Sequence, residues 1–346
     1  MNPQALLIFT MSLLLGSSTV ISANHWIMAW AGLEINTLSI LPLISKTHHP
    51  RAVEASTKYF LVQAAASTLL LFSSMTNAWF TGQWDITQLA HPMSCIMLTA
   101  AISMKLGLVP FHFWFPEVLQ GSSPMTSLLL ATAMKFPPTV LLILTSPSLN
   151  YTLLSLMAIA STALGGWMGL NQTQIRKILA FSSISHLGWM TIILIYNPKL
   201  TLITFYLYSL MTAAIFFTIN ITNTLKLSTV MTAWTKIPSL TAMLMLTLLS
   251  LAGLPPLTGF LPKWLIIQEL TKQELTVTAT VMALLSLLGL FFYLRLAYCA
   301  TITLPPNSTN YMKHWQADKS VNTPAAVLTM LSIMLLPLSP MIMTTP

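Results

Sequence analysis

The stretch Met104-Lys-Leu-Gly-Leu-Val-Pro-Phe-His-Phe-Trp-Phe-Pro-Glu-Val118 decides how this chain is organised. It places a lysine, a histidine and a glutamate in apolar sequence, beside a glycine and two prolines that a regular helix accommodates poorly. The stretch Gly253-Leu-Pro-Pro-Leu-Thr-Gly-Phe-Leu-Pro-Lys-Trp264 repeats the pattern. Matching residues lie 146 positions apart: Gly107 and Gly253, Leu108 and Leu254, Pro110 and Pro256, Pro116 and Pro262.

Two interrupted helices at corresponding places in two halves are typical of transporters built from repeats, with ion sites at the interruptions. The alternative is that glycine and proline are simply frequent in membrane helices. The residues that we expect to interrupt the helices are Gly107, Pro110, Pro116, Gly253, Pro255, Pro256 and Pro262. Because hydrocarbon cannot satisfy freed backbone groups, such breaks must face protein or water.

The composition excludes a water-soluble globule. Of the 346 residues, 55% are hydrophobic and 6% are charged, and the mean hydropathy is +0.75. Globular domains carry about 25% charged residues, so we predict an all-α polytopic membrane protein. The net charge of +8 does not indicate nucleic-acid binding, because the basic residues lie mostly between apolar runs and form no basic stripe.

A window of about 20 apolar residues, the length that crosses a bilayer, predicts about eleven transmembrane helices. Two are the broken helices, at about 93–120 and 238–271. The others cover about 3–22, 25–44, 56–79, 124–144, 149–170, 175–195, 200–224, 276–302 and 324–343. The longest polar stretch, 305–322, is expected to be a loop, so 1–346 forms a single transmembrane domain.

Basic residues in the loops predict the orientation. Loops after odd-numbered helices hold Lys199 and Lys272. Loops after even-numbered helices, with nearby helix ends, hold Lys46, Arg51, Lys58, Arg176, Lys177, Lys226, Lys236, Lys313 and Lys319. This asymmetry places the N-terminus on the inner side and, with an odd number of helices, the C-terminus on the other.

Four ionisable residues lie inside predicted membrane helices or beside their breaks. Placing a charged residue near the middle of a membrane span costs about 2.5–3.5 kcal/mol of insertion free energy. Glu34 and Lys135 fall near the midpoints of predicted helices, Lys105 precedes the first break, and Lys263 follows the second. These four are our candidates for a proton relay. The alternatives are a static Glu34–Lys105 ion pair, a snorkelling Lys135 and a loop position for Lys263.

His112, inside the first break, and His186, inside an apolar run, are further candidates for the relay, because histidine exchanges protons near neutral pH. A hydrogen-bonded packing histidine is the alternative at each position. No metal or cofactor site is predicted. Cys95 and Cys299 lie far apart in apolar segments, and no CxxC or CxxCH motif signals zinc, iron–sulfur or haem.

The chain resembles the antiporter-like membrane subunits of respiratory NADH:ubiquinone oxidoreductase, complex I, which are related to Mrp-type cation/proton antiporter subunits. The resemblance covers essentially the whole length. It is based on Met1-Asn-Pro3, Trp30-Ala-Gly-Leu-Glu-Ile-Asn36, Lys58-Tyr-Phe-Leu-Val-Gln63, 105–116, Lys135, Lys177-Ile-Leu-Ala-Phe-Ser-Ser-Ile-Ser-His186 and 253–263. It implies two inverted five-helix repeats, at about 1–145 and 149–303, each with a broken helix, and a C-terminal helix at about 324–343.

The resemblance also implies redox-driven proton pumping. Glu34 is similar to the essential glutamate of the first half, Lys105 to its partner lysine and Lys135 to the central lysine. Lys263 occupies the second-half site, which is a glutamate in some relatives. The chain itself is expected to bind no cofactor, whereas NADH, FMN, iron–sulfur clusters and ubiquinone belong to partner subunits.

The implied partners are other membrane-arm subunits, including another antiporter-like chain and small helical subunits, and phospholipids such as cardiolipin. The implied location is the mitochondrial inner membrane, with the N-terminus on the matrix side and the C-terminus on the intermembrane-space side. Two other functions fit the same residues. One is an autonomous cation/proton antiporter, and the other is a structural scaffold whose buried charges only fix helix packing.

Overall fold

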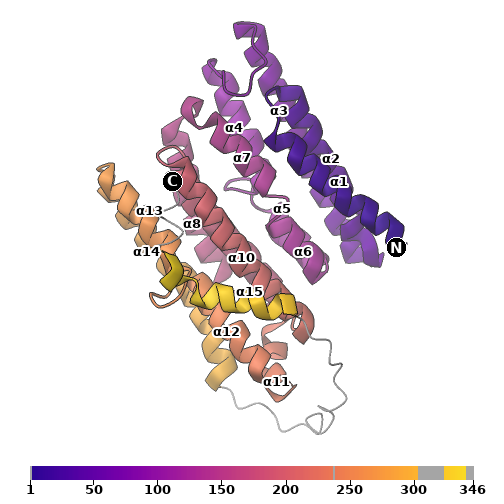
Figure 1. The fold of residues 1–346 in the computed structure, drawn as a ribbon, viewed down its shortest axis with the longest axis vertical. Coiled ribbons are helices and arrows are strands. Elements are labelled where there is room, and N and C mark those ends of the chain that lie inside the picture. The colour runs from indigo at the N-terminus through magenta and orange to yellow at the C-terminus, as the bar shows by residue number, and fades with distance from the viewer. Residues whose placement is uncertain (1, 237, 303–322, 340–346) are drawn as a thin grey trace. The chain divides into compact units, whose positions relative to one another are not determined.

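Helices make up the regular structure of the chain (Figure 1). The computed structural model describes residues 2–236, 238–302 and 323–339. In these ranges, β-type pairing is limited to isolated bridges at His25–Asp85 and Gln174–Lys226. The prediction of an all-α membrane fold is confirmed.

The chain divides into two compact units. The first unit comprises Met1–Ser161 and Met190–Pro198, and the second comprises Thr162–Trp189 and Lys199–Pro346. The division passes through α8 (Tyr151–Gly169) and α9 (Ile175–Ile193).

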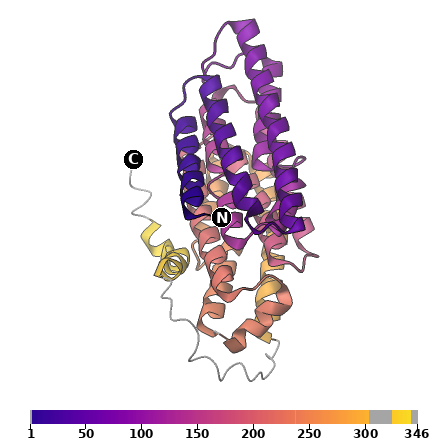
Figure 2. The ribbon, with the colours of Figure 1, turned by 90° about the vertical axis from the view of Figure 1, so that its right-hand side faces the viewer.

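The first unit begins with three long helices that lie side by side in Figure 2. Its helices are α1 (Pro3–Ile21), α2 (Trp26–Ile44), η1 (Ser45–Thr47), α3 (Pro50–Thr81), α4 (Pro92–Leu106), α5 (Trp114–Gly121), α6 (Pro124–Ala131), α7 (Phe136–Thr145) and η2 (Ser146–Ser148). Small residues bring α1 and α2 together: a Cβ on Gly16 would lie 2.9 Å from the carbonyl oxygen of Gly32. Such close backbone approach is a common way to pack helices in membranes.

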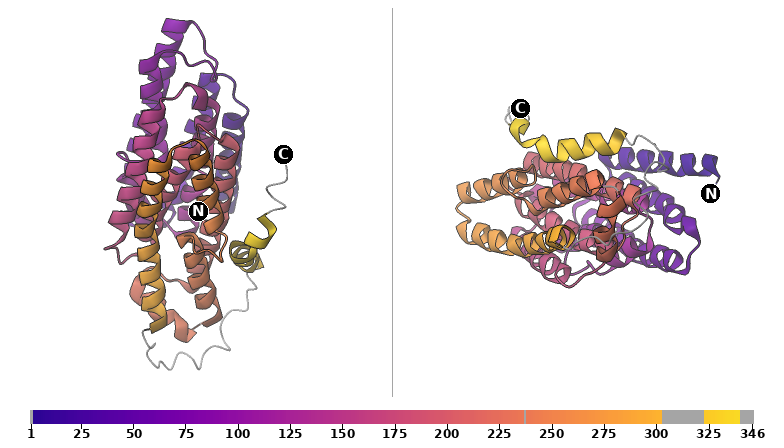
Figure 3. Two further views of the ribbon diagram at one scale, coloured as in Figure 1. Left: turned by 90° about the vertical axis from the view of Figure 1, so that its left-hand side faces the viewer. Right: turned by 90° about the horizontal axis from the view of Figure 1, so that it is seen from below.

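The second unit contains the other broken helix. Its helices are α10 (Pro198–Thr222), α11 (Leu227–Lys236), α12 (Pro238–Ala252), α13 (Phe260–Lys272), α14 (Thr276–Ile302), α15 (Thr323–Met334) and η4 (Leu336–Leu338). The orange helices α13 and α14 run side by side in Figure 3, and α15, in yellow, packs against α12. The short helix α11 lies in a segment that we expected to be a loop.

Seven helical segments of the described chain are long and apolar enough to cross a membrane: Pro3–Ile21, Trp26–Ile44, Pro50–Thr81, Pro124–Ser148, Tyr151–Gly169, Pro198–Thr222 and Thr276–Ile302. The halves of a broken helix fall below this length. At 1.5 Å per residue, α4 and α12 are each about 22 Å long, shorter than the hydrocarbon core of about 30 Å. The number eleven stays a prediction.

Two predicted helices differ clearly from the structure, and a third, predicted at about 56–79, begins earlier, at Pro50. The segment 124–144 is not continuous, because α6 ends at Ala131 and α7 starts at Phe136. Pro137 and Pro138 explain the gap, since neither has a backbone N–H and each ring clashes with the carbonyl four residues earlier. The C-terminal helix α15 ends at Met334 instead of 343, and residues 340–343 lie outside the described ranges, as do Lys313 and Lys319.

Candidate functional site

The two helices are broken at corresponding positions. The first is interrupted between Leu106 and Trp114, and the second between Ala252 and Phe260, again 146 residues further along the chain. In each break the first residue is a glycine in the left-handed region, with φ of 76° at Gly107 and 83° at Gly253. Glycine takes this conformation without steric cost, so both helices end where the sequence repeats.

The prolines of the two stretches have different roles. Pro110, Pro255 and Pro256 lie inside the breaks, where no helical hydrogen bond is needed. Pro116 and Pro262 lie in the first turns of α5 and α13. A proline is tolerated there because the N–H that it lacks has no intrahelical partner in a first turn. These two residues therefore mark where the helix resumes.

Side chains satisfy carbonyl groups that the breaks leave free. In the first break the Trp114 indole donates to the Met104 carbonyl oxygen at 3.1 Å, and the Gln63 amide donates to the Lys105 carbonyl oxygen at 3.4 Å. In the second break the Lys263 ammonium donates to the Ala252 carbonyl oxygen at 2.7 Å. Membrane helices require such partners, because lipid offers none.

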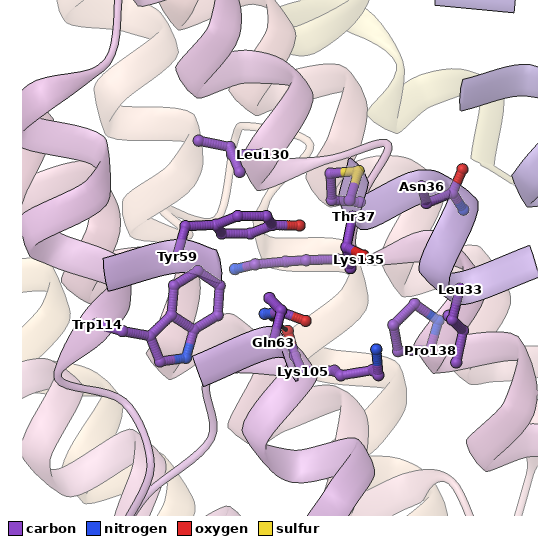
Figure 4. A pocket seen from close by; sticks show the side chains of 11 residues that line it. Leu33, Asn36, Thr37, Tyr59, Gln63, Lys105, Trp114, Leu130, Lys135 and Pro138 are labelled. Atoms are coloured by element: carbon purple, nitrogen blue, oxygen red, sulfur yellow. Dashed lines mark hydrogen bonds between the residues drawn. The ribbon is translucent and has the colours of Figure 1, made fainter. Parts of the chain in front are cut away.

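Lys105 and Lys135 line one cavity of the first unit (Figure 4). Lys105 lies on the last turn of α4 and is 5% exposed, while Lys135 immediately precedes α7 and is 2% exposed. The polar and aromatic lining also includes Asn36 and Thr37 of α2, Tyr59 and Gln63 of α3, and Trp114 of α5. Of the described residues that line the cavity, none is acidic.

The cavity is small. About 10 Å³ is open to the centre of a water molecule, which is room for about one water. In the described part of the chain, the Lys105 ammonium has no hydrogen-bond partner. Lys135 instead places its ammonium 3.9 Å from the centroid of the Phe115 ring. Two buried lysines with different surroundings thus share one site.

Glu34 lies on α2 beside the lining residue Leu33. Its Oε2 atom is buried without a hydrogen-bond partner, and within the described ranges no direct ion pair joins it to Lys105. Glu34 is near enough to act electrostatically on both Lys105 and Tyr59. The arrangement therefore differs from the static Glu34–Lys105 pair that we considered as an alternative.

The second unit has a corresponding cavity. Lys263 lines it together with His186, Ser185, Ser286 and Tyr293. About 20 Å³ is open to the centre of a water molecule, again enough for about one or two waters. The Nδ1 atom of His186 is 2.7 Å from the carbonyl oxygen of Ser182, one helical turn earlier. This contact orients the ring.

His112 does not line either lysine cavity. It lies in the first break, 1% exposed, with its ring 4.2 Å from that of Phe113. Both ring nitrogens are buried and have no hydrogen-bond partner among the described residues. The structure thus brings Lys105 and Lys135 together, and Lys263 and His186 together, and leaves His112 apart from both pairs.

Sequence reasoning missed Tyr59, Gln63 and Trp114 as parts of the site. A signal existed for the first two: they are four residues apart on α3, and so on one face of that helix, in an otherwise apolar run. It also missed the ion pairs of Lys58 with Glu54, at 2.5 Å, and with Glu117, at 2.6 Å. In the described ranges, no three or more His, Cys, Asp or Glu residues gather as a metal site.

Comparisons with known proteins identify the family of the chain. The family model described as NADH:quinone oxidoreductase/Mrp antiporter, TM, matches residues 23–289, and one described as NADH dehydrogenase subunit 2 C-terminus matches residues 290–343. The chain is 74% identical over 343 residues to NADH-ubiquinone oxidoreductase chain 2 of Struthio camelus, covering 99% of both chains.

Two solved structures share the fold. One is respiratory complex I from Thermus thermophilus with bound aureothin, with a TM-score of 0.83 and 24% identity over 97% of this chain and 80% of that chain. The other is the Mrp complex from Dietzia sp. DQ12-45-1b, with a TM-score of 0.80 and 16% identity over 96% and 75%. The match to the antiporter family model, together with the shared fold, shows that the chain is an antiporter-like membrane protein. The chain belongs to the NADH-ubiquinone oxidoreductase chain 2 family.

Proposed function

We propose that this chain translocates protons as an antiporter-like subunit in the membrane arm of NADH:ubiquinone oxidoreductase. The observation on which this function rests is the cavity that Lys105 and Lys135 share beside the first helix break. NADH oxidation and quinone reduction take place in other subunits. Family membership supports that part of the proposal.

Two lysines in one buried cavity can exchange a proton. Nearby ammonium groups repel each other strongly where the dielectric constant is low, so both are not favoured in the protonated form at once. A protonated lysine can supply a proton. A neutral lysine can accept that proton through the lone pair of its nitrogen. The cavity has room for about one water, which can take part in the transfer together with rotation of the lysine side chains.

Glu34 controls the first step in this mechanism. A carboxylate favours the protonated form of a nearby lysine, and that influence weakens if another charge attracts or neutralises the carboxylate. A change of charge outside the chain can therefore load or unload Lys105. The proton then passes to Lys135.

Lys263 and His186 form the second part of the proposed relay. They share a cavity, and His186 offers a group that exchanges protons near neutral pH. Lys263 is assigned to the exit side. His112 is a further candidate, because it is buried in a break with both ring nitrogens free of hydrogen-bond partners among the described residues.

The proposal also includes the arrangement of the repeats and the orientation of the chain in the membrane. Two inverted five-helix repeats are supported by the two breaks, whose boundaries and left-handed glycines recur at a spacing of 146 residues. The chain spans the mitochondrial inner membrane with its N-terminus in the matrix and its C-terminus in the intermembrane space. The distribution of basic residues supports this orientation.

The proposed partners are other membrane-arm subunits, including a second antiporter-like chain and small helical subunits. NADH, FMN, iron–sulfur clusters and ubiquinone belong to partner subunits, and phospholipids such as cardiolipin contact the chain. Apolar side chains exposed along α1, among them Leu7, Ile8 and Leu14, are suited to either lipid or a partner helix.

Charge-neutralising variants in the assembled complex test this function. We expect Glu34→Gln and Lys135→Met to assemble but to translocate fewer protons per NADH oxidised. The measurement is dye-monitored proton uptake by vesicles containing purified complex, with Lys199→Met, an exposed lysine outside the cavities, as the control. If both variants assembled with an unchanged stoichiometry, the chain would be a scaffold and the relay would be rejected.

A further inference from the structure

The ammonium group of Lys135 lies over the face of an aromatic ring. Its Nζ atom is 3.9 Å from the centroid of Phe115, well inside the distance of about 6 Å at which a cation is attracted by a ring quadrupole. Phe115 is fully buried and Lys135 is 2% exposed. The attraction is strongest for such desolvated pairs.

The first helix break brings the Phe115 ring to this place. Phe115 is the second residue of α5, the helix that resumes after the break. Trp114 fixes the same turn, because its indole donates to Met104 of α4 and its ring meets Phe115 edge-on with centroids 5.4 Å apart. Glu117, two residues further on, joins α5 to Lys58 of α3.

We propose that Phe115 is a further residue of the proton relay, a neutral ring that holds the protonated ammonium of Lys135. This inference rests on the proposed role of Lys135 in proton transfer. A carboxylate in the same place would bind the ammonium as a salt bridge and could take its proton. A ring attracts only the charged form and accepts no proton, so it stabilises the loaded lysine without withdrawing the proton from the path.

The ring also makes the two lysines unequal. The Lys105 ammonium has no hydrogen-bond partner in the described part of the chain, whereas Lys135 has an aromatic face. The other titratable groups at this cavity are Lys105 from α4 and Tyr59 from α3, and Glu34 on α2 acts on both. Phe115 therefore favours movement of the proton from Lys105 toward Lys135.

A series of variants at Phe115 separates the ring's electrostatics from its volume. Phe115→Leu and Phe115→Met keep an apolar side chain but remove the aromatic face, and Phe115→Tyr keeps it. Phe60→Leu is the matched control, because Phe60 lies on α3 and is 42% exposed. The measurements are assembly on a native gel, NADH oxidation, and proton uptake per electron from about pH 6 to pH 9.

We expect Phe115→Leu and Phe115→Met to lose proton uptake at a lower pH than the unmodified complex, by about one pH unit, which is about a tenfold loss of proton affinity. The sign follows because removing the ring disfavours protonated Lys135, so the site empties sooner as the pH rises. Phe115→Tyr and Phe60→Leu should keep the original profile.

The inference is overturned if Phe115→Met or Phe115→Leu assembles with the original pH profile, or if Phe115→Tyr shifts the profile as far as Phe115→Met. If the Phe115→Leu complex does not assemble, the pH profiles of Phe115→Met and Phe115→Tyr test the inference. The Lys135→Met variant tests the proposed function separately from the role of the ring. Normal pumping in Lys135→Met rejects the proposed function, whereas reduced pumping there with a normal Phe115→Met rejects only the role of the ring.

Discussion

The side-chain ammonium of Lys263 closes the second helix break by donating a 2.7 Å hydrogen bond to the carbonyl oxygen of Ala252, the last residue of α12. The donor lies on the first turn of α13. Lys263 thus connects the two halves of the broken helix. It also lines the same cavity as His186. Its structural and its proposed proton-transfer roles can be separated.

Lys263→Arg should separate them. Arginine still donates hydrogen bonds at the helix end but stays protonated at any physiological pH, so we expect normal assembly with reduced proton uptake. Lys263→Met loses both roles and should also destabilise the break, by about 1.5–3 kcal/mol for a hydrogen bond to a charged group. Hydrogen exchange of residues 253–259 and proton uptake by vesicles measure the two effects. Full pumping in an assembled Lys263→Arg complex would contradict the proposed exit role.

Alanine at the two break glycines should have unequal effects. Both residues have positive φ, so each change carries about 1–2 kcal/mol of backbone strain. A Cβ on Gly253 would also lie 2.8 Å from the Lys263 ammonium, whereas on Gly107 its nearest neighbour would be at 3.5 Å. We expect Gly253→Ala to lower the thermal stability of the complex more than Gly107→Ala. Equal losses would show that Lys263 moves away at no cost.

Glu117→Gln should loosen α5. Lys58 pairs with Glu117 of α5 and with Glu54 of its own helix, and the side chains are 42–61% exposed. Only the Glu117 pair joins two helices, so Glu54→Gln is a matched control. We expect faster hydrogen exchange in residues 114–121 for Glu117→Gln alone, an effect that decreases at high salt because exposed pairs are screened. Identical exchange in the two variants would show that the pair does not position α5.

Thr258→Val should release α15 from the second break. The Thr258 hydroxyl donates to the carbonyl oxygen of Ser332 on α15, and both residues are buried. A buried carbonyl left without its donor costs about 1–3 kcal/mol, so we expect faster proteolysis and hydrogen exchange in 323–334. Thr329→Val removes a hydroxyl that bonds only within α15 and serves as the control. Equal protection of α15 in both variants would assign its docking to apolar packing alone.

Lys135 shows how far sequence reasoning could go. Its burial was predictable, because a lysine in an apolar segment long enough to span a membrane is rare unless it has a role. Its position outside a helix was not, although Pro137 and Pro138 follow it two and three residues later. We expected Lys135 near the midpoint of one helix at about 124–144, but the structure shows a four-residue interruption between α6 and α7. Local sequence indicates that a helix is disturbed, whereas packing decides whether it bends or stops.

Phe115 and His112 show the opposite limit. Both lie in the stretch that we identified first, three residues apart, and the histidine appeared the stronger candidate because it can titrate. The structure places the neutral ring of Phe115 against Lys135 and leaves His112 away from the lysine cavities. Residue chemistry alone ranks such neighbours wrongly, because contact depends on the direction of each side chain after the break.

The sequence by itself determined the membrane class of this protein, the positions of both broken helices and the four expensive charges. Each follows from a local cost: apolar length, the φ preference of glycine, the missing N–H of proline, and the desolvation of an ion. Only the tertiary structure decided which charges share a cavity, such as Lys105 with Lys135 and His186 with Lys263. Lipid and protein interior are equally apolar, so the hydrophobic pattern of a membrane helix does not reveal which neighbour each face meets.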